Sequence, residues 1–276
     1  MLRSLARLIR PPLRRHHVPD WAAHLGADWH RRLLEADLTD RLHRKQGRNI
    51  ARWTLRGSAG RLAVFVKRHY THSWWQSLAP FARSDAAREW HHLRQANGLG
   101  IPVPRAVAFA EWSNWPGRLR SAIVLEELDG MVGLHEAIPL AAKLLSRAAF
   151  RRWKVGLIVE LVRLTKKLHD RGYFHRDLYL CHFFISSEAI EAGVSRWASR
   201  VVLIDFHRLS RQRLLPMIGR AKDLAQLLYS ARLPGVTNRD VALFWRLYCG
   251  EERRPVLRRL IEWKARRYEL HNRKRV

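Results

Sequence analysis

The sequence predicts an α+β fold of two lobes, the first built on an antiparallel β-sheet and the second mainly helical. Extended runs separated by glycine-containing turns fill the first half of the chain, and helical periodicity dominates the second half. The short polar link Asp129-Gly130 joins the two halves. We therefore expect lobes over 39–128 and 129–276, a basic segment over 1–38, and a cleft between the lobes.

The composition predicts a folded protein with an anionic partner. The 276 residues are 47% hydrophobic and 28% charged, which is enough for a substantial core. Lys and Arg number 52 against 24 Asp and Glu, so the formal net charge is +28. Self-repulsion of this size favours binding to nucleic acid, acidic phospholipid or phosphorylated glycan, and charge alone does not choose between them.

Other compositional features bear on location. No apolar run of about 18 residues is present, so we expect no transmembrane helix, and the first residues lack the pattern of a secretory signal. Cys181 and Cys249 fit no zinc spacing and predict a thiol-reduced, cytosolic protein.

Both ends of the chain are basic. Apolar residues recur at near-helical spacing between arginines at the N-terminus, which predicts an amphipathic helix on an anionic membrane, ended by Pro11-Pro12. A solvated arm is the alternative. The C-terminal stretch 253–276 reads either as a second docking surface or as a solvated terminal helix.

The first half predicts a hairpin, a helix and two further strands. Residues 48–55 and 61–70 are extended runs around a Gly-Ser-Ala-Gly turn. Ser84 is placed to cap a helix that Gly98 ends. Its apolar stripe is Ala86, Trp90 and Leu93, and the two later strands are expected over 101–112 and 121–128.

The second half predicts a long helix, a loop and a strand that ends in an aspartate. The apolar stripe of the helix is Trp153, Leu157, Leu161, Leu164 and Leu168. Gly172 ends this helix, and a loop over 173–180 leads to a short apolar run. The run VVLIDF, 201–206, is a buried strand with Asp205 near its end, and the remainder is helical and basic.

Lys67 and Glu89 form the first pair of candidate site residues. Lys67 lies on an apolar strand, where an ammonium is costly unless it is paired or faces a cleft, and it suits phosphate oxygens. Glu89 lies 22 residues later in the middle of a helix and is its natural partner. The alternative is that Lys67 extends to solvent from an edge strand.

The second group is the loop triplet His175-Arg176-Asp177 with Asp205, which lies 28 residues later at a strand end where a carboxylate can reach a metal. The triplet alone is weak evidence in so arginine-rich a chain. The order of strand lysine, helix glutamate, loop His-Arg-Asp and strand-end aspartate, however, is that of the protein kinase signature set. The sequence therefore predicts an ATP-dependent phosphotransferase.

A family resemblance follows from the same stretches. LHDRGYFHRDLYLCHFFI, VVLIDFHRL and AKDLAQLLYS resemble the bacterial lipopolysaccharide core kinases of the Kdo/WaaP type. The resemblance spans about residues 45–235, and its most specific part is HRDLYLCHFF. It implies a bilobal protein-kinase-like fold and phosphorylation of a heptose or Kdo hydroxyl, with ATP and Mg²⁺. It also implies an anionic lipopolysaccharide acceptor and a peripheral position on the cytoplasmic face of a bacterial inner membrane.

The resemblance also implies roles for single residues. Asp177 accepts or orients the proton of the acceptor hydroxyl, and Asp205 binds Mg²⁺. Lys67, braced by Glu89, holds the α- and β-phosphates. Backbone groups at Glu126, Glu127 and Leu128 face adenine. Asp223 falls where a buried carboxylate steadies the catalytic loop, and the alternative is a helix N-terminal charge.

The sequence departs from the kinase pattern at several positions. His182 replaces the usual asparagine, and it reads as a metal ligand or as a structural residue. His207 replaces the glycine after the strand-end Asp-Phe. The phosphate-covering loop retains only Gly47, so Arg48 and neighbouring amides are expected to cradle phosphate.

Two other functions stay open. The segment between Asp205 and Asp223 is short and no Ala-Pro-Glu motif is present, which disfavours a protein kinase. One alternative is a kinase-fold transferase for another small molecule or an RNA-associated target, although the Tyr-x-Cys-His-Phe pattern disfavours it. The other is a pseudokinase that binds anionic glycolipid without phosphate transfer.

Overall fold

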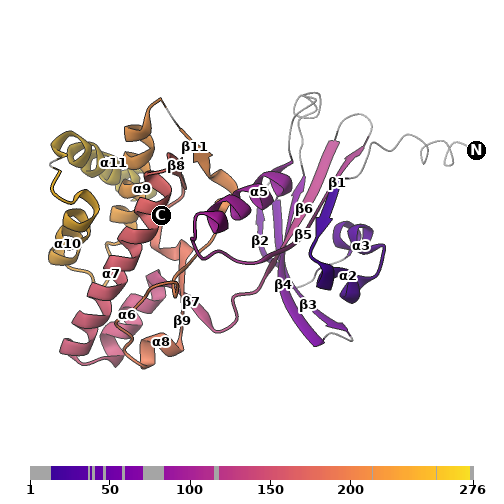
Figure 1. Ribbon diagram of the computed structural model, residues 1–276, viewed down its shortest axis with the longest axis horizontal. Helices are drawn as coiled ribbons and strands as arrows, with labels where there is room; N and C mark the ends of the chain where they lie inside the picture. The colour runs from indigo at the N-terminus through magenta and orange to yellow at the C-terminus, as the bar shows by residue number, and fades with distance from the viewer. Residues whose placement is uncertain are drawn as a thin grey trace, which may run out of the picture. The chain divides into compact units, whose positions relative to one another are not determined.

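The computed structural model of the protein (Figure 1) describes residues 14–36, 38, 41–45, 48–57, 60–70, 84–114, 118–212, 214–252 and 254–273. The chain forms two compact units. The first comprises Met1–Arg94 and Pro104–Leu128, and the second comprises Gln95–Val103 and Asp129–Val276. Antiparallel sheet and helix occur together, so the predicted α+β class is confirmed. Within the ranges given above, no helix is long and apolar enough to cross a lipid bilayer.

The first unit contains a six-stranded antiparallel sheet in the order β1-β5-β6-β4-β3-β2. Its strands are β1 (Arg14–His17), β2 (Arg41–Lys45), β3 (Arg48–Gly57), β4 (Gly60–Tyr70), β5 (Ala106–Asn114) and β6 (Arg118–Glu126). The predicted hairpin is confirmed, because β3 and β4 pair antiparallel up to Gly57 opposite Gly60. β5 begins later than predicted because Pro102 and Pro104 precede it, and proline has no N–H for a strand ladder.

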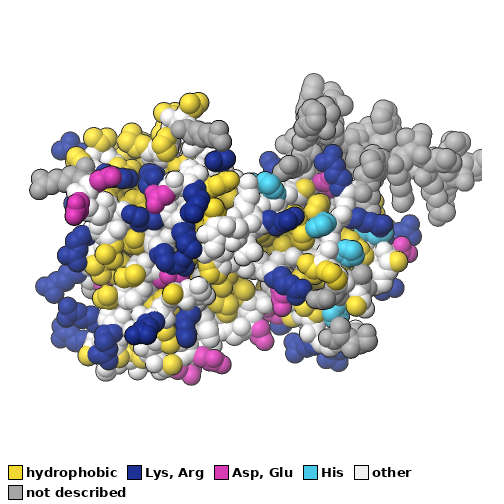
Figure 2. All heavy atoms as spheres, viewed as in Figure 1, with side chains coloured by type: hydrophobic (Ala, Val, Ile, Leu, Met, Phe, Trp, Pro, Cys, Tyr) yellow, Lys and Arg dark blue, Asp and Glu magenta, His cyan; other side chains and the backbone are white. Residues whose placement is uncertain are grey.

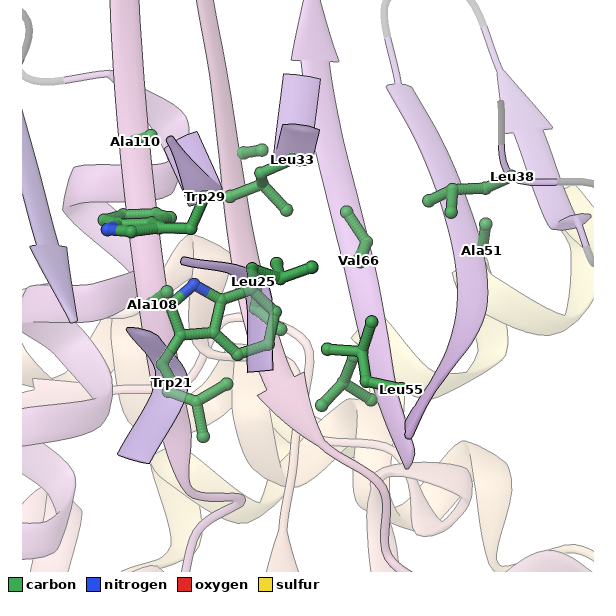
Figure 3. Packing of buried hydrophobic residues seen from close by; sticks show 14 residues of the cluster. Trp21, Leu25, Trp29, Leu33, Leu38, Ala51, Leu55, Val66, Ala108 and Ala110 are labelled. Atoms are coloured by element: carbon green, nitrogen blue, oxygen red, sulfur yellow. The ribbon is translucent and has the colours of Figure 1, made fainter. Parts of the chain in front are cut away.

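Two short helices, α2 (Pro19–Leu25) and α3 (Trp29–Glu35), pack their apolar side chains against residues of this sheet (Figure 3). Trp21 and Leu33 are fully buried, and Trp29 is nearly so. Residues 14–36 therefore belong to the first unit and supply part of its core, so they do not form the basic arm that the sequence predicted. Burying large aromatic and aliphatic side chains outweighs the charge of this segment. The predicted amphipathic helix within residues 1–13 lies outside the described residues.

Helix α5 (Asp85–Gly98) begins and ends where the sequence predicts. Ser84 Oγ accepts a hydrogen bond of 3.1 Å from the amide of Ala87, which satisfies one of the free N–H groups at the helix start. The predicted apolar stripe is confirmed, because Ala86, Trp90 and Leu93 are all buried.

The second unit is mainly helical. Its helices are α6 (Leu134–Leu144), α7 (Arg147–His169), α8 (Glu188–Glu191), α9 (Pro216–Ser230), α10 (Asn238–Cys249) and α11 (Pro255–Arg273). The whole predicted stripe of the long helix α7 is buried, and the residues concerned are Trp153, Leu157, Leu161, Leu164 and Leu168. A core cluster joins α7 to the later helices through Ile158, Leu224, Tyr248 and Ile261.

Short strands and turns carry the loops of the second unit. β7 (Met131–Gly133), β9 (Phe183–Ser186) and β10 (Val202–Leu203) form one sheet in the order β10-β9-β7, and β8 (Tyr173–Phe174) pairs with β11 (Ser210–Arg211). The 3₁₀ turns are η1 (Leu180–His182) and η2 (Phe206–Arg208). The predicted strand 201–206 is shorter than expected because Asp205 takes a left-handed conformation, with φ 65°.

Gly219 allows α9 to pack against the ring of Phe174, which directly precedes the His-Arg-Asp triplet. A Cβ at Gly219 would lie 2.4 Å from Phe174 Cγ. We expect Gly219→Ala to lower the free energy of unfolding by about 1–3 kcal/mol through overpacking. In the control Gly98→Ala, where a Cβ meets nothing within 4 Å, alanine is expected to raise it by up to about 1 kcal/mol. Urea denaturation measures both, and equal effects would contradict the packing argument.

Candidate active site

A buried ion pair links the sheet of the first unit to α5. Lys67 lies on β4, which is flanked on both sides by β3 and β6. Its Nζ is 2.6 Å from Glu89 Oε1, and the Glu89 side chain is fully buried. Lys67 therefore does not extend to solvent from an edge strand. A buried charge without a partner is strongly destabilising, so the ion pair fixes the orientation of the Lys67 side chain.

The first unit also contains the other residues expected to bind a nucleotide. Glu126 ends β6, and the next amide, that of Glu127, donates a hydrogen bond of 2.9 Å to the carbonyl of Ala63. The Glu127 carboxylate accepts from Arg52 at 2.8 Å, and Leu128 is half-buried. Gly47 lies outside the described residues. Arg48 begins β3, but its side chain lies outside the described part of the structure.

Three side chains in the second unit are placed to hold a metal ion. Ligand atoms of Asp177, Asp205 and His207 all lie within 4.8 Å of one another. Asp177 follows β8, Asp205 follows β10, and His207 lies in η2 with Nδ1 2.6 Å from Asp205 Oδ1. Both aspartates were predicted from the sequence as site residues, but His207 was noted only as the residue that replaces the usual glycine. The Asp-x-His spacing at a strand end was the available signal.

His182, the other predicted metal ligand, lies outside this group. Its Nδ1 is 2.6 Å from the carbonyl of Asp177, and its Nε2 is 3.8 Å from Asp205 Oδ2. Burial lowers the pKa of His182, but Cys181, the Asp177 carbonyl and Asp205 outweigh burial and raise it to about 9. The imidazole thus ties the backbone of one aspartate to the side chain of the other, which matches the structural interpretation of His182.

His175 and Arg176 shape the backbone around Asp177. His175 is fully buried, and burial lowers the pKa of its side chain, which disfavours the charged ring. Its Nε2 is 3.0 Å from the carbonyl of Ile204, the residue before Asp205. Arg176 has a left-handed φ of 64°, as Asp205 does with 65°, and only three non-glycine residues of the described chain have positive φ. His175 and Arg176 thus shape the backbone beside Asp177 and Asp205.

One face of α9 binds the backbone of the loop that carries Asp177. The buried Asp223 carboxylate accepts hydrogen bonds of 2.7 Å from the amides of both His175 and Arg176. Asp223 lies in the middle of α9, so it is not a helix N-terminal charge. It has the contacts expected of a carboxylate that steadies the loop.

Two further residues of α9 continue this contact, and the sequence analysis missed both. Gln226 accepts from the amide of Leu178 at 3.0 Å, and Ser230 accepts from the amide of Leu180 at 2.9 Å. With Asp223 they are spaced three, four and seven residues apart, so they lie on one helix face. Polar side chains at this helical spacing were the only signal in the sequence.

Cations surround Asp177. Arg208 Nη1 is 3.9 Å from Asp177 Oδ1. Burial lowers the pKa of Lys222, and the positive charges of Arg208 and Arg176 lower it further. The second unit therefore combines a fixed carboxylate, a group that can hold a metal, and a positive field. This combination can orient a hydroxyl and bind phosphate groups.

Comparisons with known proteins agree with this chemistry. The family model described as "Lipopolysaccharide kinase (Kdo/WaaP) family" matches residues 33–248. The lipopolysaccharide core heptose(I) kinase WaaP of Pseudomonas aeruginosa is 33% identical over 232 residues, which cover 81% of this chain and 84% of that protein. The protein of the same name from Escherichia coli K12 is 28% identical over 172 residues, 62% of this chain and 63% of that one.

A solved structure is similar over nearly the whole chain. It is described as WaaP in complex with acyl carrier protein, and it matches with a TM-score of 0.68 and 29% sequence identity. The match covers 94% of this chain and 98% of that one. The bilobal protein-kinase-like class predicted from the sequence is thereby confirmed.

Proposed function

Because the chain belongs to the lipopolysaccharide kinase (Kdo/WaaP) family, we propose that it transfers the γ-phosphate of ATP to a hydroxyl of an inner-core heptose of lipopolysaccharide. Kdo is the alternative acceptor sugar. The observation that carries this proposal is the group Asp177, Asp205 and His207, of which Asp177 lies on a loop whose backbone α9 fixes. The same acceptor accounts for the net charge of +28, since lipopolysaccharide is a polyanion.

Asp177 is the proton acceptor in this mechanism. The acceptor oxygen forms a bond to the γ-phosphorus while the bond between this phosphorus and the β–γ bridging oxygen breaks, and ADP leaves. The hydroxyl proton passes to the Asp177 carboxylate. Arg208, 3.9 Å from that carboxylate, and Lys222 contribute positive charge beside it.

Asp205 and His207 would hold the Mg²⁺ that accompanies ATP. The Asp205 carboxylate suits a hard cation, which prefers oxygen ligands, and His207 would add a softer nitrogen. When bound, the ion neutralises charge on the phosphate oxygens. His182 would keep Asp177 and Asp205 in place through its contacts with the Asp177 carbonyl and the Asp205 carboxylate.

Lys67 would hold the α- and β-phosphates of ATP, and Glu89 would direct the lysine toward them. Backbone groups at Glu126 and Leu128 would face adenine. Gly47 and Arg48 would cover the phosphates.

We expect Glu89→Leu to lower the free energy of unfolding by about 3 kcal/mol, because it removes the carboxylate that a buried ammonium contacts.

The double variant Lys67→Met/Glu89→Leu tests this pair without that instability. Apolar side chains of similar volume are expected to restore most of the stability, while ATP affinity falls by about tenfold or more. Urea denaturation and calorimetric titration with ATP measure the two effects. ATP binding by the double variant at the affinity of the unmodified protein would contradict the role of Lys67.

We propose a peripheral position at the cytoplasmic face of the inner membrane, because the proposed acceptor is a membrane-anchored glycolipid. An acyl carrier protein is a further proposed partner, since a similar solved structure is described as a complex with one. Native mass spectrometry of the protein purified from its own cells would detect such a complex, and its absence there would remove this partner.

The proposed activity is tested on the glycolipid itself. Mass spectrometry of the lipopolysaccharide core from cells with and without the gene is expected to differ by one phosphate on one sugar. Purified protein with ATP and Mg²⁺ should restore that phosphate. An unchanged core, together with tighter binding to ribosomal RNA than to anionic vesicles, would favour the RNA-associated alternative. Binding of the glycolipid without any transfer would favour a pseudokinase.

A further inference from the structure

Five consecutive apolar residues, two just before α9 and three in its first turn, are exposed. Leu214 is 93% exposed, Leu215 63%, and Met217 and Ile218 are each 47% exposed, with exposed Pro216 between them. Figure 2 shows a group of hydrophobic side chains at the place of this segment in Figure 1. We call Leu214–Ile218 the apolar segment. Contiguous exposure of this kind marks an interaction surface, because single exposed apolar residues are ordinary but runs of them are not.

The apolar segment is attached at both ends to the elements that hold the catalytic loop. Before it, β11 pairs with β8, and the amide of Gln212 donates a hydrogen bond of 2.9 Å to the carbonyl of Gly172. Its last three residues, Pro216–Ile218, form the first turn of α9, the helix whose Asp223 binds the loop amides. Whatever the segment contacts is therefore held close to the loop that carries Asp177.

The surroundings of the apolar segment are basic. Arg171 and Arg211 are both exposed, and the Arg211 guanidinium lies 5.4 Å from the centre of the Tyr173 ring. In the sequence Arg213 directly precedes Leu214. Apolar side chains flanked by arginines match the interface of an anionic bilayer, where the apolar groups enter the acyl boundary and the cations meet the headgroups. A second copy of this chain, with a net charge of +28, would be repelled.

We infer that Leu214–Ile218 insert into the interface of an anionic bilayer and so bring the loop with Asp177 to an acceptor anchored in that bilayer. This inference deepens the proposed function and rests on it for the nature of the acceptor. It explains the exposed apolar side chains, which neither the loop that carries Asp177 nor the packing of the core accounts for.

The test replaces two leucines and measures vesicle binding. Leu214→Gln/Leu215→Gln is compared with Leu144→Gln, a control on α6 where the leucine is 56% exposed. Both variants change exposed side chains, so urea denaturation should show unchanged stability. Vesicles of phosphatidylcholine alone and of phosphatidylcholine with phosphatidylglycerol are the probes. We expect the double variant to bind the anionic vesicles at least about tenfold more weakly than the unmodified protein, and the control to differ by less than about twofold.

A second arm separates docking from chemistry. With lipopolysaccharide acceptor in vesicles, the double variant should lose kcat/KM by a similar factor, whereas transfer to a water-soluble core oligosaccharide should be unchanged. Equal vesicle binding by the double variant and the unmodified protein would overturn the inference. So would an equal loss of transfer to both acceptors. If the unmodified protein phosphorylates neither acceptor, the proposed function fails, and the vesicle arm still decides whether the segment docks.

Discussion

Asp177→Asn is expected to lower kcat for phosphate transfer by about a thousandfold, in the range of general-base contributions, and to leave the affinity for ATP within about twofold. An amide has no carboxylate oxygen to take up the hydroxyl proton. The contacts that hold the loop use the carbonyl of residue 177 and the amides of its neighbours. These contacts survive the substitution, so the change removes the chemistry and keeps the structure.

Single-turnover transfer to the glycolipid and calorimetric titration with ATP measure the two effects. Asp170→Asn is a matched control, because this carboxylate is 55% exposed and, among the described residues, forms an ion pair of 3.4 Å with Arg220. Its rate should stay within about twofold of the unmodified protein. A rate for Asp177→Asn within tenfold of the unmodified protein would show that another group accepts the proton.

Asp223→Ala is expected to lower the free energy of unfolding by about 3–5 kcal/mol and to reduce kcat by about a hundredfold. The substitution leaves two buried amides, those of His175 and Arg176, without their acceptor. It also removes the carboxylate oxygen that lies 3.2 Å from His169 Nε2. Asp177 would then lie on a loop with an altered backbone.

Asp223→Asn refines this prediction. One of the two loop amides would face an NH₂ group in place of an oxygen, so most of the loss in stability should remain. Glu252→Ala removes an exposed carboxylate and is the control, with an expected change of less than about 0.5 kcal/mol. Urea denaturation and steady-state kinetics supply the measurements. Stability of Asp223→Ala within 1 kcal/mol of the unmodified protein would contradict the account of the loop.

Local patterns in the sequence predicted much of the fold. The hairpin of β3 and β4, the cap at Ser84 and the buried stripe of α7 all follow from short-range spacing, and all are present. The expected arm over 1–38 was wrong for residues 14–36, because their aromatic side chains are buried in a core that only the folded sheet creates. The many basic residues in this stretch made it resemble a solvated arm, although its aromatic side chains belong to the core.

The candidate site divides in the same way. The order of the motifs along the chain was enough to predict the ionisable residues Lys67, Glu89, Asp177 and Asp205. Gln226 and Ser230 were not, since each makes hydrogen bonds to the backbone of a loop some 50 residues away in the chain. His207 was visible as a departure, but its contact with Asp205 depends on the left-handed turn at that aspartate.

The hydrogen bonds between α9 and the loop have a consequence for binding energy. The amides at positions 175, 176, 178 and 180 are all satisfied by side chains of the same unit, without any ligand. The conformational entropy of this loop is therefore lost when the chain folds, so ordering the loop does not reduce the free energy of substrate binding. Affinity for the sugar can then be devoted to choosing between one hydroxyl and its neighbours.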